Sequence, residues 1–266
     1  MIRQTSLINA VVSRVYRFAA IRLIAKWLLK GVTMKQPFYN GWICFDAVKD
    51  SWMWSGPMRG DSYERWFQDI LVRLAADYEI FVDIGSNIGC MTLSILLRNP
   101  TIKAVCVDAC HRAMNCLKES IHINKLEGRI ETIEAAVTAV DGDVTFDDSK
   151  GVLSHINSRG KKVAGVKFSS LVNKYSRFNR CLVKIDVEGH ETVLLKQLPD
   201  LRYRHNLCLV VELHPRGYLG IGDPELCLRL LKDSGGIVES IQNVPFDIIA
   251  KEPVYTYEVM VKWPGP

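Results

Sequence analysis

Residues 83–89 read Asp-Ile-Gly-Ser-Asn-Ile-Gly, and they follow the apolar run Ile80–Val82. A short apolar run of this kind predicts a buried strand, and the glycines predict a sharp turn into a helix. Because glycine has no Cβ, Gly85 and Gly89 let the backbone turn tightly and approach a bound ligand. The stretch therefore predicts a strand, a ligand-binding loop and a helix, which together open an α/β sheet.

The rest of the chain repeats this alternation of apolar strands and amphipathic helices. The strands that we predict are Ile80–Ile84, Ala104–Asp108, Ile130–Glu134, Cys181–Asp186, Leu207–Glu212, Gly236–Asn243 and Tyr255–Trp263. Seven strands with crossover helices predict one α/β, Rossmann-like, doubly wound sheet. In such a sheet ligands bind outside the carboxyl ends of the strands.

Two segments depart from this alternation. Residues 36–60 are rich in aromatic residues, Gly and Pro, and we expect a hairpin of Trp42–Phe45 with Trp52–Trp54 ahead of a helix over Tyr63–Ala76. Residues 141–166 have no helical period and contain several turn dipeptides. Two interpretations of this second segment are equally open. It is either a mobile surface loop or a hairpin insertion on the substrate side that pairs Val144–Phe146 with Val163–Lys167.

Asn87 and Cys90 distinguish between two possible cofactors. A dinucleotide loop of the type G-x-G-x-x-G that starts at Gly85 would need glycine at both of these positions. The spacing D-x-G-x-N-x-G instead fits a loop around the methionine portion of S-adenosylmethionine, which has no pyrophosphate to bind. We therefore predict S-adenosyl-L-methionine as the cofactor, bound by Asp83, Gly85, Asn87 and Gly89.

Two acidic residues extend the predicted cofactor site. Asp108 ends the next strand about 20 residues beyond Gly85, where a carboxylate can accept hydrogen bonds from ribose hydroxyls. The alternative role for Asp108 is to cap the helix that follows. Glu134 ends the third strand, where the topology of the sheet would place the adenine ring, and its assignment rests on topology alone.

A second motif, at residues 183–191, reads Val-Lys-Ile-Asp-Val-Glu-Gly-His-Glu. Structural roles account for one acidic residue as a cap and for the glycine as a tight turn. They do not account for three carboxylates and one imidazole within six residues. The next strand ends in Glu-Leu-His at residues 212–214. If the two strands are neighbours, their polar residues converge beside the glycine loop: Asp186, Glu188, Glu212 and His214.

With these motifs the chain resembles the FkbM family of methyltransferases, from about residue 40 to residue 262. The motifs that carry the resemblance are residues 62–64, 83–89, 184–191 and 212–214. The chain departs from the family at Asp108-Ala109, where the family usually has Glu-Pro. The resemblance implies a class I methyltransferase sheet with an antiparallel last strand. It also implies transfer of a methyl group to oxygen on a sugar, a glycolipid or a natural product.

Methylation of a hydroxyl requires removal of its proton, so a general base or a metal is expected. His190 and His214 are candidate bases because neutral imidazole is available near pH 7, although either could be a surface or capping histidine. Glu188 is a third candidate, and Asp186 is better suited to orienting the donor or the acceptor. Asp186, Glu188 and Glu212 offer hard oxygen ligands for Mg²⁺ or Mn²⁺, but we do not predict a metal.

The composition sets limits on compartment and partner. The chain of 266 residues is 48% hydrophobic and 24% charged, which fits a folded domain with a substantial core. A net charge of +5 without a basic stripe predicts no specific nucleic-acid partner, so we expect a small-molecule or glycan acceptor. The eight cysteines form no CxxC pair, and we expect reduced, buried thiols in the cytoplasm.

The first 35 residues lie outside the resemblance. Leu7–Leu29 is apolar but is interrupted by Arg14, Arg17, Arg22 and Lys26, whereas a membrane-spanning helix needs about 20 nearly uncharged residues. We predict a basic amphipathic helical extension over residues 1–35 and a methyltransferase domain over residues 36–266. The helix either packs on protein or makes a peripheral contact with an anionic membrane.

Three other function classes remain as alternatives. An N-methyltransferase would use the same cofactor on a different acceptor atom. A non-catalytic, methyltransferase-like scaffold is disfavoured by the intact Gly85 and Asp186. An NAD-dependent oxidoreductase is disfavoured by Asn87 and Cys90. The sequence predicts neither the identity of the acceptor nor the oligomeric state.

Overall fold

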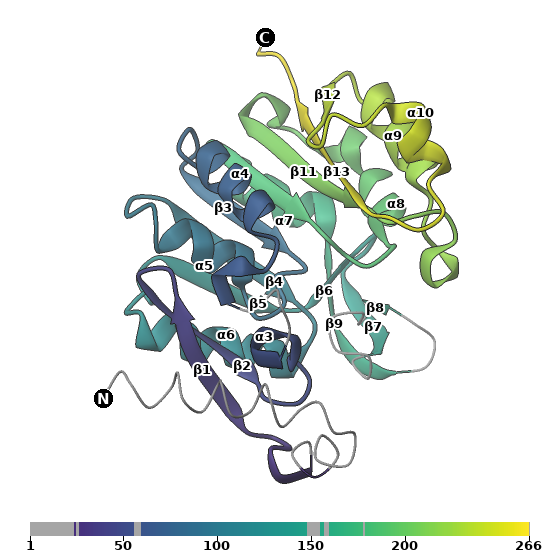
Figure 1. Cartoon of the computed structure of the whole chain (residues 1–266). Helices are drawn as coiled ribbons and strands as arrows, with labels where there is room; N and C mark the ends of the chain where they lie inside the picture. The colour runs from purple at the N-terminus through teal and green to yellow at the C-terminus, as the bar shows by residue number, and fades with distance from the viewer. Residues whose placement is uncertain are drawn as a thin grey trace.

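The computed structural model describes residue 24 and residues 27–55, 60–147, 155–156, 160–177 and 179–265. A seven-stranded sheet with the order β12-β13-β11-β10-β3-β4-β5 forms its centre (Figure 1). The strands are β3 (Ile80–Ile84), β4 (Lys103–Asp108), β5 (Ile130–Glu134), β10 (Cys181–Ile185), β11 (Leu207–Leu213), β12 (Ile237–Ser240) and β13 (Tyr257–Lys262). Every strand that the sequence predicts for this sheet is present.

The directions of the strands also agree with the prediction. β11, β10, β3, β4 and β5 run parallel to one another, so that Val183 of β10 pairs with Val82 on one side and Leu209 on the other. β13, the last strand of the chain, runs antiparallel to both β11 and β12. The fold is therefore the predicted α/β, Rossmann-like, doubly wound sheet, with an antiparallel last strand.

Helices cover both faces of the sheet, which explains why the central strands are apolar throughout rather than alternating. Phe81 packs into the core on one face and its neighbour Val82 into the core on the other. The helices on the first face are α3 (Trp52–Ser55), α4 (Arg65–Ala75), α5 (Cys90–Leu96) and α6 (His111–Ile123). Those on the second face are α7 (Phe168–Ser176), α8 (Glu191–Leu195), α9 (Pro224–Asp233) and α10 (Phe246–Lys251). Short 3-10 turns are η1 (Gly60–Ser62), η3 (Leu198–Asp200), η4 (Arg204–Asn206) and η5 (Tyr218–Gly220).

The predicted N-terminal hairpin is wrong in one of its two strands. β2 (Gly41–Asp46) pairs antiparallel with β1 (Thr33–Phe38), whereas Trp52–Ser55 is helical. The chain leaves β2 through tight turns, because the carboxylate of Asp46 accepts hydrogen bonds from the amides of Val48 and Lys49. This hairpin packs on α6, where the Ser120 hydroxyl accepts a 2.8 Å hydrogen bond from the amide of Cys44.

The insertion forms a hairpin, as the second of the two open interpretations predicts, although Phe146 pairs with Lys161 rather than within residues 163–167. β7 (Gly142–Asp147) pairs antiparallel with β9 (Lys161–Lys167), and Val144 lies opposite Val163. Two further strands, β6 (Ala136–Thr138) and β8 (His155–Ile156), were not predicted. They extend the hairpin to a four-stranded sheet with the order β6-β9-β7-β8.

The predicted N-terminal extension lies largely outside the described residues, which omit residues 1–23. Trp27 and Leu28 are helical and are 77% and 64% exposed, and β1 begins at Thr33. Among the described helices, none has the length and apolar character needed to span a bilayer. All eight cysteines of the chain are described, and each is buried and outside any disulfide, as the sequence predicts.

Candidate functional site

The glycine loop connects β3 to α5 with three residues in the left-handed backbone region. Gly85, Asn87 and Gly89 have φ angles of 80°, 49° and 84°. A Cβ on Gly85 would lie 1.7 Å from the backbone oxygen of Asp186, and one on Gly89 would lie 2.5 Å from Leu117. The glycines are therefore required to pack the loop against the end of β10 and against α6. Asn is one of the few other residue types that adopt this conformation readily.

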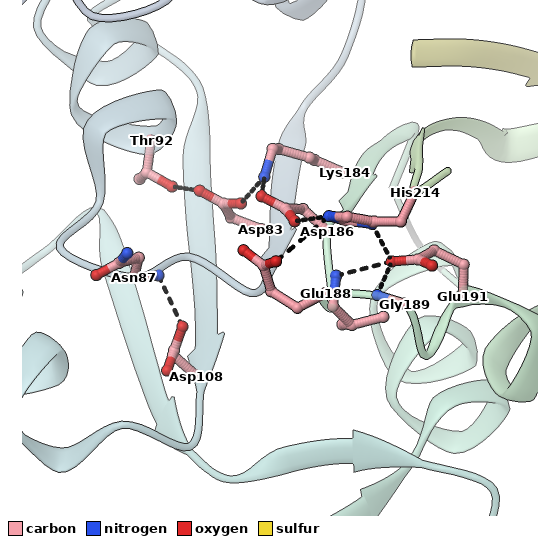
Figure 2. A network of polar contacts seen from close by, with 11 residues as sticks. Asp83, Asn87, Thr92, Asp108, Lys184, Asp186, Glu188, Gly189, Glu191 and His214 are labelled. Atoms are coloured by element: carbon pink, nitrogen blue, oxygen red, sulfur yellow. Dashed lines mark hydrogen bonds and ion pairs between the residues drawn. The ribbon is translucent and has the colours of Figure 1, made fainter. Parts of the chain in front are cut away.

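Asp108 connects this loop to the end of β4. Its Oδ2 accepts a 2.8 Å hydrogen bond from the amide of Asn87 (Figure 2). Its Oδ1 accepts a 2.7 Å bond from the amide of Cys110. Burial raises the pKa of Asp108 to about 6, even though both of these bonds favour the charged form. Each oxygen of a carboxylate has two lone pairs, so Asp108 retains the capacity to accept bonds from a ligand.

A cavity lies at the carboxyl ends of β3, β4 and β10 and encloses about 1000 Å³, including the space at its mouth. Of the residues predicted from the sequence, those that line it are Gly85, Asn87, Asp108, Asp186, Glu188 and His190. The small sheet contributes Phe146 and Ile156, and the segment before α4 contributes Tyr63 and Glu64. The cavity thus brings both sequence motifs together.

Glu134, which was predicted to lie beside the adenine ring, does not line this cavity. Its side chain is directed toward α6, where one carboxylate oxygen lies 2.8 Å from His111 Nδ1 and the other lies 3.8 Å from Lys118 Nζ. The wall after β5 is formed instead by the apolar residues Ala135, Ala136 and Val137. The topology of the sheet correctly predicts that the end of β5 lies at the cavity. The direction of the Glu134 side chain, however, is set by its local partners His111 and Lys118.

Asp83 and Gly89 lie beneath the cavity rather than on its wall. Asp83 is 1% exposed, and its Oδ2 accepts a 2.6 Å hydrogen bond from the hydroxyl of Thr92. Gly89 is the N-cap residue of α5 and is also buried. The structure therefore gives these two predicted cofactor contacts a supporting position, in which they hold the loop and the first turn of α5.

Lys184 is a buried cation at the base of the cavity, and sequence reasoning did not assign it a role. Its Nζ lies 2.9 Å from Asp186 Oδ2 and 3.9 Å from Asp83 Oδ1 (Figure 2). Burial alone would lower the pKa of Lys184, but the carboxylates of Asp186, Asp83 and Glu212 outweigh it and raise the pKa. In the sequence, Lys184 could have been identified as a site residue by its position within the second motif, residues 183–191.

His214 is held between carboxylates on both of its ring nitrogens. It is 4% exposed, with Nδ1 2.9 Å from Glu191 Oε1 and Nε2 3.4 Å from Glu188 Oε2. Burial opposes the charge of the ring, but the bonds to Glu188 and Glu191 raise the pKa of His214 to about 11. His214 does not line the cavity, and its raised pKa favours the protonated form, so its role as general base stays a prediction that the geometry does not support.

Glu191 organises the turn of the second motif. The same Oε1 that faces His214 accepts hydrogen bonds from the amides of Gly189 at 3.1 Å and Val187 at 3.3 Å. Glu188, inside this turn, has a left-handed φ of 54°, and the Tyr218 hydroxyl donates a 2.7 Å hydrogen bond to its Oε2. Non-glycine residues are held in this conformation only when the surrounding contacts enforce it. The turn therefore fixes the Glu188 carboxylate on the cavity wall.

Glu64 is a second glutamate on the cavity wall, and only the resemblance of residues 62–64 gave a signal for it. It occupies the N-cap position of α4 with a left-handed φ of 44°, and its side chain forms no capping hydrogen bond. Burial raises the pKa of Glu64, and the charges of Asp186 and Glu188 raise it further while Lys184 opposes them. The Glu64 side chain therefore lines the cavity instead of capping α4.

Asp186, Glu212 and His214 offer ligand atoms within 4.8 Å of one another, a spacing that a metal ion can bridge. Lys184 already pairs with Asp186 in this region, and the bonds to Glu188 and Glu191 raise the pKa of His214. Burial and the charge of Asp186 raise the pKa of Glu212 well above its usual range.

Several solved structures are similar to this chain. An O-methyltransferase family protein from Burkholderia thailandensis has a TM-score of 0.49 and 12% identity, over 83% of this chain and 59% of its own. The precorrin-6y C5,15-methyltransferase from Geobacter metallireducens GS-15 has a TM-score of 0.45 and 8% identity, over 76% of this chain and 90% of its own. The S-adenosylmethionine-dependent methyltransferase SibL has a TM-score of 0.46 and 11% identity, over 77% of this chain and 56% of its own.

The chain thus spans less than two thirds of the first and third of these proteins. No protein-family model matches the chain. No curated protein matches it either. The reaction therefore has to be inferred from the residues of the site itself.

Proposed function

We propose that this protein is an S-adenosylmethionine-dependent methyltransferase that methylates a hydroxyl oxygen on a sugar, a glycolipid or another small molecule. The observation that carries the proposal is the hydrogen bond between Asn87 and Asp108 at the wall of the cavity. It sets the loop expected around the methionine portion of the donor beside the carboxylate expected to bind its ribose. Membership of the FkbM family is part of the same proposal and rests on the sequence motifs.

The polar atoms of the cavity fit the chemistry of this donor. Asn87 Oδ1 and Asp186 Oδ1 are both buried and have no hydrogen-bond partner among the described residues. A buried acceptor without a donor is costly, which suggests that a ligand supplies the missing N–H or O–H groups. S-adenosylmethionine carries an ammonium group and two ribose hydroxyls, all of which are hydrogen-bond donors. Asn87 and Asp186 would bind the ammonium, and Asp108 would bind the ribose.

When bound, S-adenosylmethionine supplies a methyl group that its sulfonium charge already activates, so alignment provides most of the remaining rate. The acceptor hydroxyl must still lose its proton. Glu188 and His190 line the cavity and are the candidates to accept it. His214 and Tyr218 hold the Glu188 carboxylate in place and act as positioning residues.

The proposal is tested by supplying the protein with a donor that carries a ¹³C-labelled methyl group and with small molecules extracted from cells. We expect a new ¹³C resonance at the chemical shift of an O-methyl group, whereas an N-methyl resonance would assign the alternative acceptor atom. No labelled product together with no donor binding would favour the scaffold alternative. The same assay in EDTA tests the metal, since full activity excludes one.

His190 is tested by comparison with an exposed histidine elsewhere. We expect His190→Ala to reduce kcat at least ~10-fold with unchanged donor affinity, because loss of a general base costs about 10²–10⁴-fold. His205→Ala is the matched control, since His205 is exposed in η4 and lies outside the cavity lining. Full activity of His190→Ala would indicate that Glu188, and not His190, is the general base.

A further inference from the structure

The acceptor side of the cavity combines an aromatic pair with two carboxylates. Trp52 and Tyr63 lie with ring centroids 4.4 Å apart and with their planes tilted by 42°. Both rings line the cavity together with Glu64 and Glu188. These four residues come from α3, from the segment before α4 and from the turn after β10. They are distinct from the loop and the Asp108 carboxylate assigned to the donor.

Lys184 and His214, the positively charged groups near this side of the cavity, already have carboxylate partners. Lys184 is paired with Asp186 at 2.9 Å, and His214 is paired with Glu191 at 2.9 Å as well as with Glu188 at 3.4 Å. Among the described residues, Glu64 forms no ion pair within 4.0 Å. The cavity wall therefore carries more negative than positive charge, even with Lys184 included.

We infer that the methyl acceptor is a cation, with a protonated amine or quaternary ammonium group bound between Glu64, Glu188 and the Trp52–Tyr63 pair. This inference rests on the proposed function, of which it specifies the acceptor. A cation gains from the faces of aromatic rings and from carboxylates, and the gain is larger in a partly desolvated site. A neutral sugar would leave Glu64 without an ion-pair partner, whereas an amino sugar or an amino alcohol would supply one.

The experiment compares two probes of nearly the same shape that differ in charge. Choline is a quaternary ammonium alcohol, and 3,3-dimethyl-1-butanol is its neutral carbon isostere. Binding of each to the full-length protein is measured by calorimetry, with and without saturating S-adenosylhomocysteine. We expect choline to bind at least ~10-fold more tightly than the neutral alcohol, and we expect Glu64→Gln to reduce this preference to less than about threefold.

Glu127→Gln is the matched control, because Glu127 is exposed beside His122 and lies outside the cavity lining. It should leave the preference for choline unchanged. Equal affinities for the two alcohols, or no binding of either at about 100 mM, would overturn the inference. The calorimetry without S-adenosylhomocysteine keeps the two proposals separable. Failure to bind S-adenosylhomocysteine counts against the donor, whereas failure to prefer choline counts only against the cationic acceptor.

Discussion

The amide of Asn87 lies 2.8 Å from Oδ2 of Asp108, and this one hydrogen bond joins the glycine loop after β3 to the end of β4. The loop and the carboxylate were predicted as two separate cofactor contacts about 20 residues apart. In the structure they form one preorganised unit, whose geometry is set before a ligand binds. The proposed function depends on this unit, and the first predictions concern it.

Replacement of Asp108 by Asn should weaken binding of S-adenosylhomocysteine at least ~10-fold, because a charge-assisted hydrogen bond contributes about 1.5–3 kcal/mol. The Asn side chain keeps one oxygen that can accept the bond from the Asn87 amide. Isothermal titration calorimetry measures the effect. Glu134→Gln is the control, because Glu134 faces His111 outside the cavity. A loss of affinity in Glu134→Gln equal to that in Asp108→Asn would contradict the placement of both residues.

The affinity for the donor should also depend on pH through Asp108. Burial raises the pKa of this carboxylate to about 6, and ribose hydroxyls donate more strongly to its ionised form. Affinity should therefore be constant above about pH 7 and fall as the pH drops below about 6, by up to tenfold per pH unit. Calorimetry between pH 5 and 8 measures this profile. Asp108→Asn should remove the dependence, and a profile that stays unchanged in the variant would assign it to another group.

Gly85→Ala should abolish donor binding and destabilise the fold. The new Cβ would lie 1.7 Å from the backbone oxygen of Asp186, so the loop and the end of β10 could not both keep their positions. Gly217→Ala is a matched control, because Gly217 has a similar φ of 75° but no atom within 4 Å of the added Cβ. It should cost only about 1–2 kcal/mol of unfolding free energy, with donor affinity unchanged. Equal effects of the two substitutions in urea unfolding and calorimetry would show that the close contact is unimportant.

His214→Gln should lower the free energy of unfolding by about 3–5 kcal/mol at neutral pH, because it leaves buried carboxylates without their cation. The pKa of His214 is raised from 6.5 to about 11, so its contribution is fully present below pH 6.5 and is lost as the pH rises through about 11. The difference between wild type and variant in urea unfolding should therefore be smaller at pH 9.5 than at pH 6.5. His111→Gln, which removes an exposed partner of Glu134, should cost no more than about 1 kcal/mol. A difference that grows with pH would show that His214 is neutral in the folded protein.

The centre of the sheet could be predicted because β3, β10 and β11 are buried on both faces. β3 begins and ends at the predicted residues, since an apolar run bounded by turn signals reports burial directly. The N-terminal hairpin was harder to predict from the sequence. Both the aromatic run at Trp52 and the segment Thr33–Phe38 have the composition of a strand that could pair with β2. Which of them pairs is decided by the turns that Asp46 forms and by the packing of β2 on α6.

The candidate site could be predicted only in part, because side-chain direction and charge depend on contacts between distant residues. The second motif indicated the correct end of the strands, but it did not predict that His214 is buried there between Glu188 and Glu191, which raise its pKa. The direction of the Glu134 side chain could not be predicted, because topology fixes the end of a strand and not the side to which its last residue points. Glu64 carried no pattern of its own, and its position depends on α4 packing beside the sheet.

We expect the Asn87–Asp108 unit to bind S-adenosylmethionine. Calorimetric titration of the protein with S-adenosylhomocysteine and, separately, with NAD tests this expectation. We predict one S-adenosylhomocysteine bound per chain with micromolar affinity, at least ~10-fold weaker binding by Asp108→Asn, and no detectable binding of NAD. Binding of NAD in preference to S-adenosylhomocysteine, or S-adenosylhomocysteine binding that is unchanged in Asp108→Asn, would contradict it.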